Sequence, residues 1–436
     1  MAINYFLCLQ CTNKLLHSEK CSHLQPLTNA PQKIITKTIW VLSFVSLFTD
    51  VASEMLYPVM PLFLKHIGYT AIFIGILEGV AEAVAGLSKS YFGKRSDISG
   101  KRLPFVQLGY FFSAVSKPML AIFIYPWWIF LSRTIDRLGK GIRTGARDAM
   151  LSDESRPETK GRVFGFHRSM DSMGAVIGPA IALVYLYFYP DNYKTLFLIA
   201  FLPGMLAVIS TLIIKEKKKT AVATNNGKRT TTSVFAFAAY WKNSPAQYKK
   251  LVTGLLLFAL FNSSDVFLLL KMKESGFNDT SIIGVYIFYN LVFALLAYPI
   301  GILADKIGLK KIFIAGLFAF SIVYLGFAFN NNIIVFFLLF FMYGVYAAAT
   351  EGISKAWITN IADAGETATA IGTYSGFQSI CALIASSLCG LLWFNFGAKI
   401  TFLITAGITL LVIAYLSFNK INAKALKTGN PDFVTL

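Results

Sequence analysis

Long apolar stretches separated by short polar breaks run through the sequence. A membrane-spanning helix needs about 20 predominantly apolar residues. Twelve segments meet this requirement, and we predict a spanning helix in each: 38–64, 71–93, 104–125, 127–149, 162–188, 193–214, 251–271, 280–304, 311–329, 332–355, 367–394 and 398–418. The pattern therefore predicts an all-α membrane protein that crosses the bilayer twelve times.

The composition excludes an ordinary soluble protein. Hydrophobic residues make up 56% of the 436 residues and charged residues 14%, whereas soluble domains contain about 25% charged residues. The net charge of +18 would suit binding to nucleic acid, but the basic residues lie in the short breaks between apolar segments. Positive charge of this kind is typical of cytoplasmic loops. We therefore expect a lipid bilayer, and no nucleic acid, as the partner.

The basic residues also predict the orientation in the membrane. Five of the 40 Lys and Arg residues lie in the loops of one side: Lys65, Lys194, Lys271, Lys273 and Lys399. The other 35 lie in the spans or on the opposite side. By the positive-inside rule, both termini and segment 215–250 are expected in the cytoplasm. The protein is accordingly expected in the cell (inner) membrane.

Segment 215–250 divides the spans into two groups of six. It carries nine Lys or Arg residues against one acid, Glu216, and its polar core is typical of a flexible linker. The predicted organisation is a cytoplasmic tail at 1–37, a six-helix bundle at 38–214, the basic linker at 215–250, a second six-helix bundle at 251–418 and a cytoplasmic tail at 419–436.

The two groups of spans share a motif. "GKRSDISGKR" follows the second span and "GILADKIGLKK" follows the eighth, so that Gly93, Asp97 and Gly100 recur 208 residues later. A repeat of six spans around a central linker is the layout of secondary transporters built from two similar bundles.

Over residues 38–418 the chain resembles the major facilitator superfamily. The resemblance rests on the pattern Gly-x-x-x-Asp-x-x-Gly-basic-basic and on its copy, in which Leu309 precedes the two lysines. It implies the major facilitator fold and a conformational hinge, in which Asp97 pairs with basic groups and with a helix end of the opposite half. The implied hinge residues are Gly93, Asp97, Gly100, Lys101, Arg102 and, in the copy, Asp305.

A second motif lies in span five. Gly165, Gly174, Gly178 and Pro179 fit Gly-x8-Gly-x3-Gly-Pro, which resembles the motif of superfamily antiporters that export drugs and metabolites against protons. The Gly-Gly that usually follows is replaced by other residues. Small residues at this spacing also serve simple helix packing. On this motif we favour export over uptake.

Ionisable residues inside the predicted spans are functional candidates, because charge in a bilayer is costly. In span four, Arg133, Arg137 and Lys140 share one helix face, which is expected to look into the bundle or a wet cavity. Further along this span, residues expected at the cytoplasmic end are Arg143, Arg147 and Asp148. The residues predicted for proton coupling or the substrate cavity are Asp50, Glu54, Glu78, Glu82, Arg133, Asp136, Arg137, His167 and Asp171.

By depth, Asp50, Glu54 and Asp171 are the best candidates for a proton carrier. For each acid the alternative is a structural ion pair, above all for Glu351 and Lys355, four residues apart in span ten. Aromatic candidates for the cavity wall are Tyr57, Tyr286, Tyr289 and Trp357.

The leading hypothesis is a secondary active transporter that exports a small organic compound in exchange for protons. The alternatives are a proton-coupled importer of a metabolite, and a metal or metal-chelate carrier that uses the acids with His167. The sequence contains no His-Glu-x-x-His, Gly-x-Ser-x-Gly or Gly-x4-Gly-Lys-Ser/Thr motif, so we expect no enzyme, catalytic residue or cofactor and an ion gradient in place of ATP. The cysteines and histidines of the tail match no standard zinc pattern, so we expect no bound metal. We expect a monomer.

Overall fold

The computed structural model describes residues 34–57, 59–69, 71–216, 236–262, 265–277, 279–363, 365–419 and 421. Among these residues none forms a strand, and the chain from Ile35 onward forms one compact unit. The first half contains α1 (Lys37–Glu54), α2 (Val59–His66), α3 (Ala71–Ser99), α4 (Leu103–Ile122), α5 (Pro126–Asp153), the 3₁₀ helix η1 (Pro157–Thr159), α6 (Lys160–Phe188) and α7 (Tyr193–Thr211).

The second half repeats this arrangement. It contains α8 (Ala236–Asn243), α9 (Ala246–Ala259), α10 (Val266–Glu274), α11 (Asp279–Ile307), α12 (Leu309–Phe329), α13 (Ile333–Ile361) and α14 (Thr367–Phe418). Helix α14 covers the last two predicted spans, which meet at a kink where Gly397 has φ 77°. Glycine adopts this left-handed conformation without the steric cost that a Cβ brings. Helix α8 and the start of α9 lie within the predicted linker.

Two of the predicted spans are interrupted helices at corresponding places in the halves. Span one consists of α1 and α2, and span seven consists of α9 and α10. The sequence places Pro58 between α1 and α2, and a proline disfavours helical geometry in the residue before it. The twelve-span arrangement in two six-helix bundles agrees with the prediction from the apolar pattern.

Seven helices in the described part of the chain are long and apolar enough to cross a membrane by length and composition alone. Helix α5 is not among them although it has 28 residues, because the stretch from Arg133 to Asp148 is densely charged. Most of these charged side chains are buried within the protein. Composition alone would not place α5 in a membrane. The helix can lie there because the surrounding helices shield its charges from lipid.

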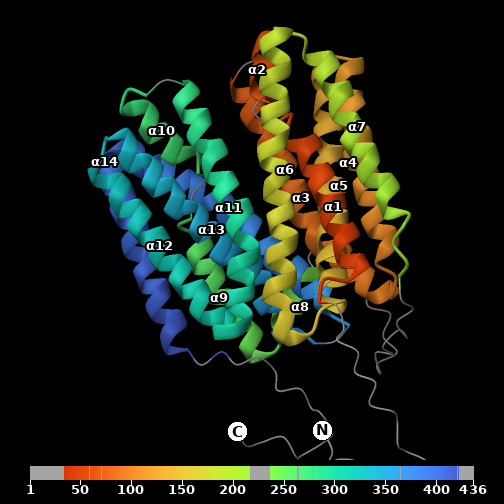
Figure 1. Ribbon diagram of the computed structural model, residues 1–436, viewed down its shortest axis with the longest axis vertical. Helices are drawn as coiled ribbons and strands as arrows, with labels where there is room; N and C mark the ends of the chain where they lie inside the picture. Colours follow the sequence, from red (N-terminus) through yellow and green to blue (C-terminus); the bar gives the residue numbers. More distant parts are fainter. Residues whose placement is uncertain are drawn as a thin grey trace, which may run out of the picture. The chain divides into compact units, whose positions relative to one another are not determined.

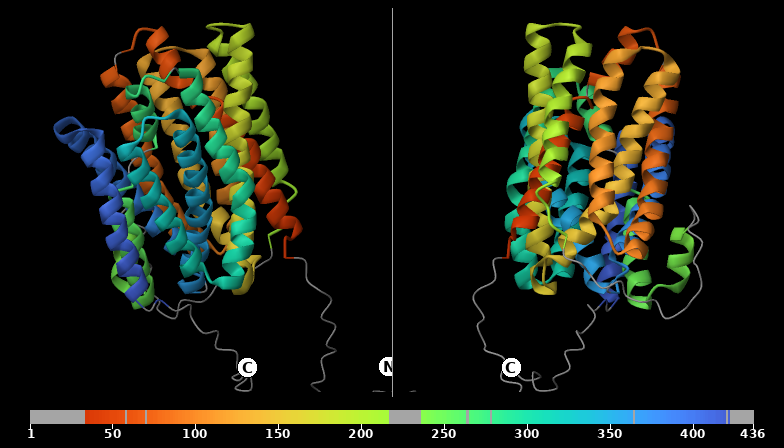
Figure 2. Two further views of the ribbon diagram at one scale, coloured as in Figure 1. Left: turned by 60° about the vertical axis from the view of Figure 1, so that its left-hand side comes forward. Right: turned by 90° about the vertical axis from the view of Figure 1, so that its right-hand side faces the viewer.

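The long helices run side by side along one axis (Figures 1 and 2). Residues 97–102 and 305–310 lie at the same end, which we call the signature face. Three hydrogen bonds place further segments at this face. Thr36, before α1, donates to Glu154 after α5 at 3.3 Å, and the backbone N–H of Arg102 donates to Glu216 after α7 at 2.6 Å. Asn360, at the end of α13, donates to the Pro157 carbonyl before α6 at 3.1 Å. The alternate loops meet at the opposite end, where the Tyr69 hydroxyl donates to the Ile124 carbonyl at 2.7 Å.

The two bundles pack against each other mainly through α3 with α14 and α6 with α11. Glycines permit this close approach. A Cβ on Gly93 of α3 would lie 2.5 Å from the carbonyl oxygen of Ala368 in α14. A Cβ on Gly165 of α6 would likewise collide with the carbonyl of Ala297 in α11. The bundle interface therefore depends on backbone contact between helices of opposite halves.

Candidate functional site

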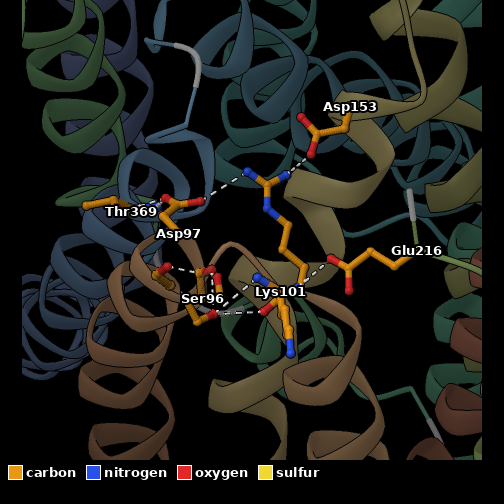
Figure 3. A network of polar contacts seen from close by, with 9 residues as sticks. Ser96, Asp97, Lys101, Asp153, Glu216 and Thr369 are labelled. Carbon is orange, nitrogen blue, oxygen red and sulfur yellow. Dashed lines mark hydrogen bonds and ion pairs between the residues drawn. The ribbon is translucent and has the colours of Figure 1, made fainter. Parts of the chain in front are cut away.

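The carboxylate of Asp97 binds the first turn of a helix from the other bundle. Its Oδ2 accepts hydrogen bonds from the backbone N–H of Thr369 at 2.7 Å and from the Thr369 hydroxyl at 2.8 Å (Figure 3). Its Oδ1 accepts from the guanidinium of Arg102 at 3.0 Å. A carboxylate at a helix N-terminus satisfies unpaired N–H groups and interacts favourably with the helix dipole. Asp97 thus ties α3 to α14.

Asp305 makes the equivalent contact with the halves exchanged. Its two carboxylate oxygens accept from the backbone N–H groups of Gly161 at 2.7 Å and Arg162 at 2.9 Å, in the first turn of α6. In this copy Leu309 separates Gly308 from the two lysines. The first of them, Lys310, binds the end of α14: its ammonium donates to the carbonyls of Ser417 at 3.1 Å and Asn419 at 3.0 Å. Both copies of the motif therefore cap a helix of the opposite bundle.

Arg102 links Asp97 to two acids that were not predicted from the sequence. Its guanidinium pairs with Asp153, at the end of α5, as well as with Asp97. Glu216 accepts from the backbone N–H groups of Arg102 at 2.6 Å and Leu103 at 3.2 Å, and so caps α4 (Figure 3). The isolation of Glu216 among basic residues was the available signal. Lys101 is exposed, and Gly100 has φ 65° at the turn.

A cavity of about 440 Å³ lies between the two bundles. Helices of both halves line it, and the acids predicted in spans one and five, Asp50, Glu54 and Asp171, meet there, whereas His167 lies outside its lining. Charged side chains that line the cavity are Asp50, Glu54, Lys89, Lys140, Arg143, Arg147, Arg168, Asp171, Glu351 and Lys355. Aromatic side chains that line it are Phe258, Tyr286, Tyr289, Phe293, Phe313, Tyr346 and Tyr374. The first bundle supplies most of the charge, and the second supplies the aromatic surface.

Helix α5 lines the cavity with the later part of the predicted face, because Lys140, Thr144 and Arg147 continue the i, i+4, i+7 spacing of Arg133, Arg137 and Lys140. Lys140, Arg143, Thr144 and Arg147 line the cavity, at the spacing of one helix face. Arg143, Arg147 and Asp148, which were expected at the cytoplasmic end, are all at least 90% buried within the protein and so do not extend into water. Their depth in the membrane stays a prediction. Helix α5 continues to Asp153, past the predicted end at 149.

Arg133, Asp136 and Arg137 lie outside the cavity lining of the described residues. The carboxylate of Asp136 accepts from the ammonium of Lys117 and from the hydroxyl of Ser113, both at 2.6 Å, and Arg133 lies 4.0 Å away. These groups are buried between α4 and α5. Their contacts are those of an ion-paired packing cluster inside the first bundle.

Asp171 is held by neighbours on its own helix. Arg168 donates to Asp171 at 2.9 Å, and the ring of His167 lies 3.7 Å from the same carboxylate. His167 also contacts the hydroxyl of Ser43 in α1 at 3.4 Å. By contrast, Asp50 and Glu54 line the cavity one helix turn apart, and neither forms an ion pair with a described residue.

Glu351 and Lys355 of α13 pair with the opposite bundle. Arg168 of α6 binds Glu351, and Asp148 of α5 lies 2.7 Å from the ammonium of Lys355. Arg147 also binds Asp148, at 2.9 Å. The interpretation of Glu351 and Lys355 as a local structural pair therefore misses their main contacts, which cross the bundle interface at the cavity.

Some of the remaining predicted residues line the cavity and others do not. Tyr286 and Tyr289 line the cavity, whereas Trp357 packs against Phe313 and Tyr57 is 48% exposed. Glu78 and Glu82 lie in α3, and their side chains fall outside the described residues.

The glycines of the span-five motif serve close packing of α6. A Cβ on Gly174 would lie 2.8 Å from the Cβ of Asp50, and one on Gly178 would lie 2.7 Å from the backbone nitrogen of Met55, both toward the α1 side. Pro179 is buried inside α6. The motif therefore sets how closely α6 approaches α1, the helix that carries Asp50 and Glu54.

In the described part of the chain no three His, Cys, Asp or Glu side chains come together as a metal site. The cysteines and histidines of the tail, Cys8, Cys11, Cys21, His17 and His23, lie outside the described residues.

Comparison with known proteins agrees with this architecture. A relative from Methanocaldococcus jannaschii, described as an uncharacterized MFS-type transporter, is 32% identical over 397 residues, which cover 88% of this chain and 97% of that protein. The quinolone resistance protein NorA of Staphylococcus aureus is 25% identical over 190 residues, which cover 43% of this chain and 48% of NorA.

The fold is also found among solved structures. The E. coli fucose:proton symporter FucP superposes with a TM-score of 0.70 at 11% identity, over 88% of this chain and 99% of that one. The sequence profile of the Major Facilitator Superfamily matches residues 42–290 and 266–432. The chain therefore belongs to the major facilitator superfamily, whose members are transporters of small molecules across lipid bilayers and not enzymes.

Proposed function

We propose that this protein is a proton-coupled secondary active transporter that exports a small organic compound by alternating access. The observation that carries the proposal is the charged cavity between two bundles whose contacts at one end are helix caps. A substrate in this cavity touches both bundles at once. Its binding therefore affects how the two bundles sit against each other, which alternating access requires.

The signature face is closed by contacts that rigid-body motion of the bundles would break. Asp97 with Thr369, Asp305 with Gly161, and Lys160 with the Thr359 carbonyl at 2.8 Å all join opposite halves. If the signature face is cytoplasmic, as the basic residues predict, this conformation is closed toward the cytoplasm. Opening the cavity to that side requires the loss of both helix caps.

Asp50 and Glu54 are the carboxylates that we propose as proton carriers. Both line the cavity, and both lack an ion pair among the described residues, so protonation does not have to break a salt bridge. Asp171 is a weaker candidate than its depth suggested, because Arg168 already binds its carboxylate and His167 lies beside it, so protonation would weaken these contacts.

The direction of transport has support on both sides. Export is supported by the span-five motif and by the similarity to NorA, a resistance protein, over part of the chain. Import, the second candidate, is supported by the basic side chains on α5, because an anion and a proton would bind such a cavity together and would travel in the same direction.

The experiment is transport in proteoliposomes with an imposed pH gradient and a pH-sensitive dye inside. A quinolone is the first probe, because NorA is a quinolone resistance protein. Proton movement that depends on both protein and probe supports the proposal, and its sign separates exchange from co-transport. Asp50→Asn and Glu54→Gln should abolish gradient-driven accumulation and leave downhill exchange of the probe intact. If the wild-type protein moves substrate with no response to the gradient, proton coupling is wrong.

A further inference from the structure

Two basic side chains on α5, Lys140 and Arg143, line the cavity and form no ion pair with a described residue. Lys140 is solvent-exposed and lines the cavity, and no hydrogen bond or ion pair ties its ammonium to a described residue. Arg143 is 96% buried, and its Nη1 has no hydrogen-bond partner there. A buried guanidinium that lacks an acceptor is costly. The cavity wall therefore carries positively charged groups whose hydrogen-bond donors lack an acceptor.

Arg143 is also held in place. Its guanidinium carbon lies 4.7 Å from the centre of the Tyr110 ring, so one face of the group is stacked while the Nη1 edge stays unpaired. Lys140 precedes it by three residues, on the same side of α5. An oxyanion between them would accept charge-assisted hydrogen bonds from both, which are about twice as strong as neutral ones.

The second bundle lines the same cavity with aromatic rings. Tyr286, Tyr289 and Phe293 are spaced along one face of α11, and the hydroxyl of Tyr289 donates to Asp265 at 3.2 Å, which fixes that ring. The volume of about 440 Å³ falls within the ~300–1,000 Å³ of sites for small organic ligands. An apolar or aromatic ligand body would pack against this surface.

We propose that the substrate is an amphipathic organic anion, whose carboxylate, sulfonate or phosphate binds Lys140 and Arg143 of α5 and whose apolar body lies against Tyr286, Tyr289 and Phe293 of α11. The inference rests on the proposed transport function, because it names what the cavity between the bundles carries. The binding test does not depend on the direction of transport, but an anion that binds together with a proton favours co-transport, the second candidate above, over exchange.

The neighbouring acids set how the anion and protons interact. Asp50 and Glu54 line the same cavity, and when ionised they compete with the substrate for Lys140 and Arg143. When they carry protons this competition ends. By linkage, the anion and the proton therefore promote each other's binding. A cationic substrate would instead displace the proton.

The test uses three probes that share one aromatic body: phenylbutyrate, phenylbutylamine and phenylbutyramide. Binding to the purified full-length protein in detergent is measured by calorimetry and by the shift of the melting temperature. Phenylbutyrate should bind saturably and raise the melting temperature, and the amine and the amide should not. Preference for the amine, equal binding of all three, or no binding by phenylbutyrate would overturn the proposal.

Variants assign the binding to α5. Lys140→Gln should weaken phenylbutyrate binding by at least about tenfold, equivalent to ~1.4 kcal/mol, and Lys140→Arg should retain it. Lys194→Gln removes the same charge from an exposed position at the start of α7 and should have no effect. If the Arg143→Gln variant folds, it should weaken phenylbutyrate binding as Lys140→Gln does. If it does not fold, Lys140→Gln still tests the proposal, because Lys140 is exposed. Undiminished binding by Lys140→Gln would refute the assignment. This binding result is independent of proton coupling, which the vesicle experiment tests separately.

Discussion

Replacing Asp97 by asparagine should open the signature face without unfolding the protein. The carboxylate accepts two hydrogen bonds from Thr369 and one from Arg102, and asparagine keeps the shape but loses the charge and one acceptor. A hydrogen bond to a charged group contributes ~1.5–3 kcal/mol. Each ~1.4 kcal/mol changes an equilibrium tenfold, so the ratio of closed to open molecules should fall roughly 10- to 100-fold.

The assay is a spin-label distance measurement across the closed face. Labels on Ile98→Cys and Glu366→Cys are exposed and flank the contact between α3 and α14, in a protein whose native cysteines have been replaced. Asp97→Asn should add a population at longer distance and lower the rate of transport. The control is Asp191→Asn, an exposed acid at the opposite end of the helices. An unchanged distance distribution with normal transport would show that Asp97 does not hold this face closed.

Further predictions concern the remaining contacts. Asp305→Asn should shift the same equilibrium in the same direction, read by labels on Glu158→Cys and Lys306→Cys, and an unchanged distance there would contradict the equivalence of the two caps. Lys355→Glu should reduce the amount of folded protein by leaving Asp148 beside a second negative charge, and the double variant with Asp148→Lys should recover it, measured as the monodisperse fraction in size-exclusion chromatography. A reporter active only outside the cytoplasm should stay inactive when fused within 215–250, and activity there would reverse the predicted orientation.

The apolar pattern was sufficient to predict the spans and the two-bundle fold, because a bilayer imposes a length and a composition on any helix that crosses it. The motif repeated at Asp97 and Asp305 is visible in the sequence, and both of these carboxylates contact a helix of the opposite bundle. Their partners were not visible. Thr369, Gly161 and the cap formed by Glu216 depend on which helix ends meet in space.

Depth and pairing were harder to predict than the presence of charge. The last charges of span four were expected at the cytoplasmic end of the helix, whereas Arg143 and Arg147 line the cavity and Asp148 is buried beside them. Sequence spacing likewise suggested that Glu351 and Lys355 pair with each other.

The structure shows why local spacing fails for these two residues. An i, i+4 pair on one helix is worth only a few tenths of a kcal/mol, whereas an unpaired charge buried between the bundles costs several times more. Glu351 and Lys355 instead pair outward with Arg168 and Asp148 of the first bundle, each of which also has a partner on its own helix. The same contacts then join the two bundles beside the cavity. A substrate that competes for Arg168 or Glu351 would weaken this junction, which connects occupancy of the cavity to the separation of the bundles.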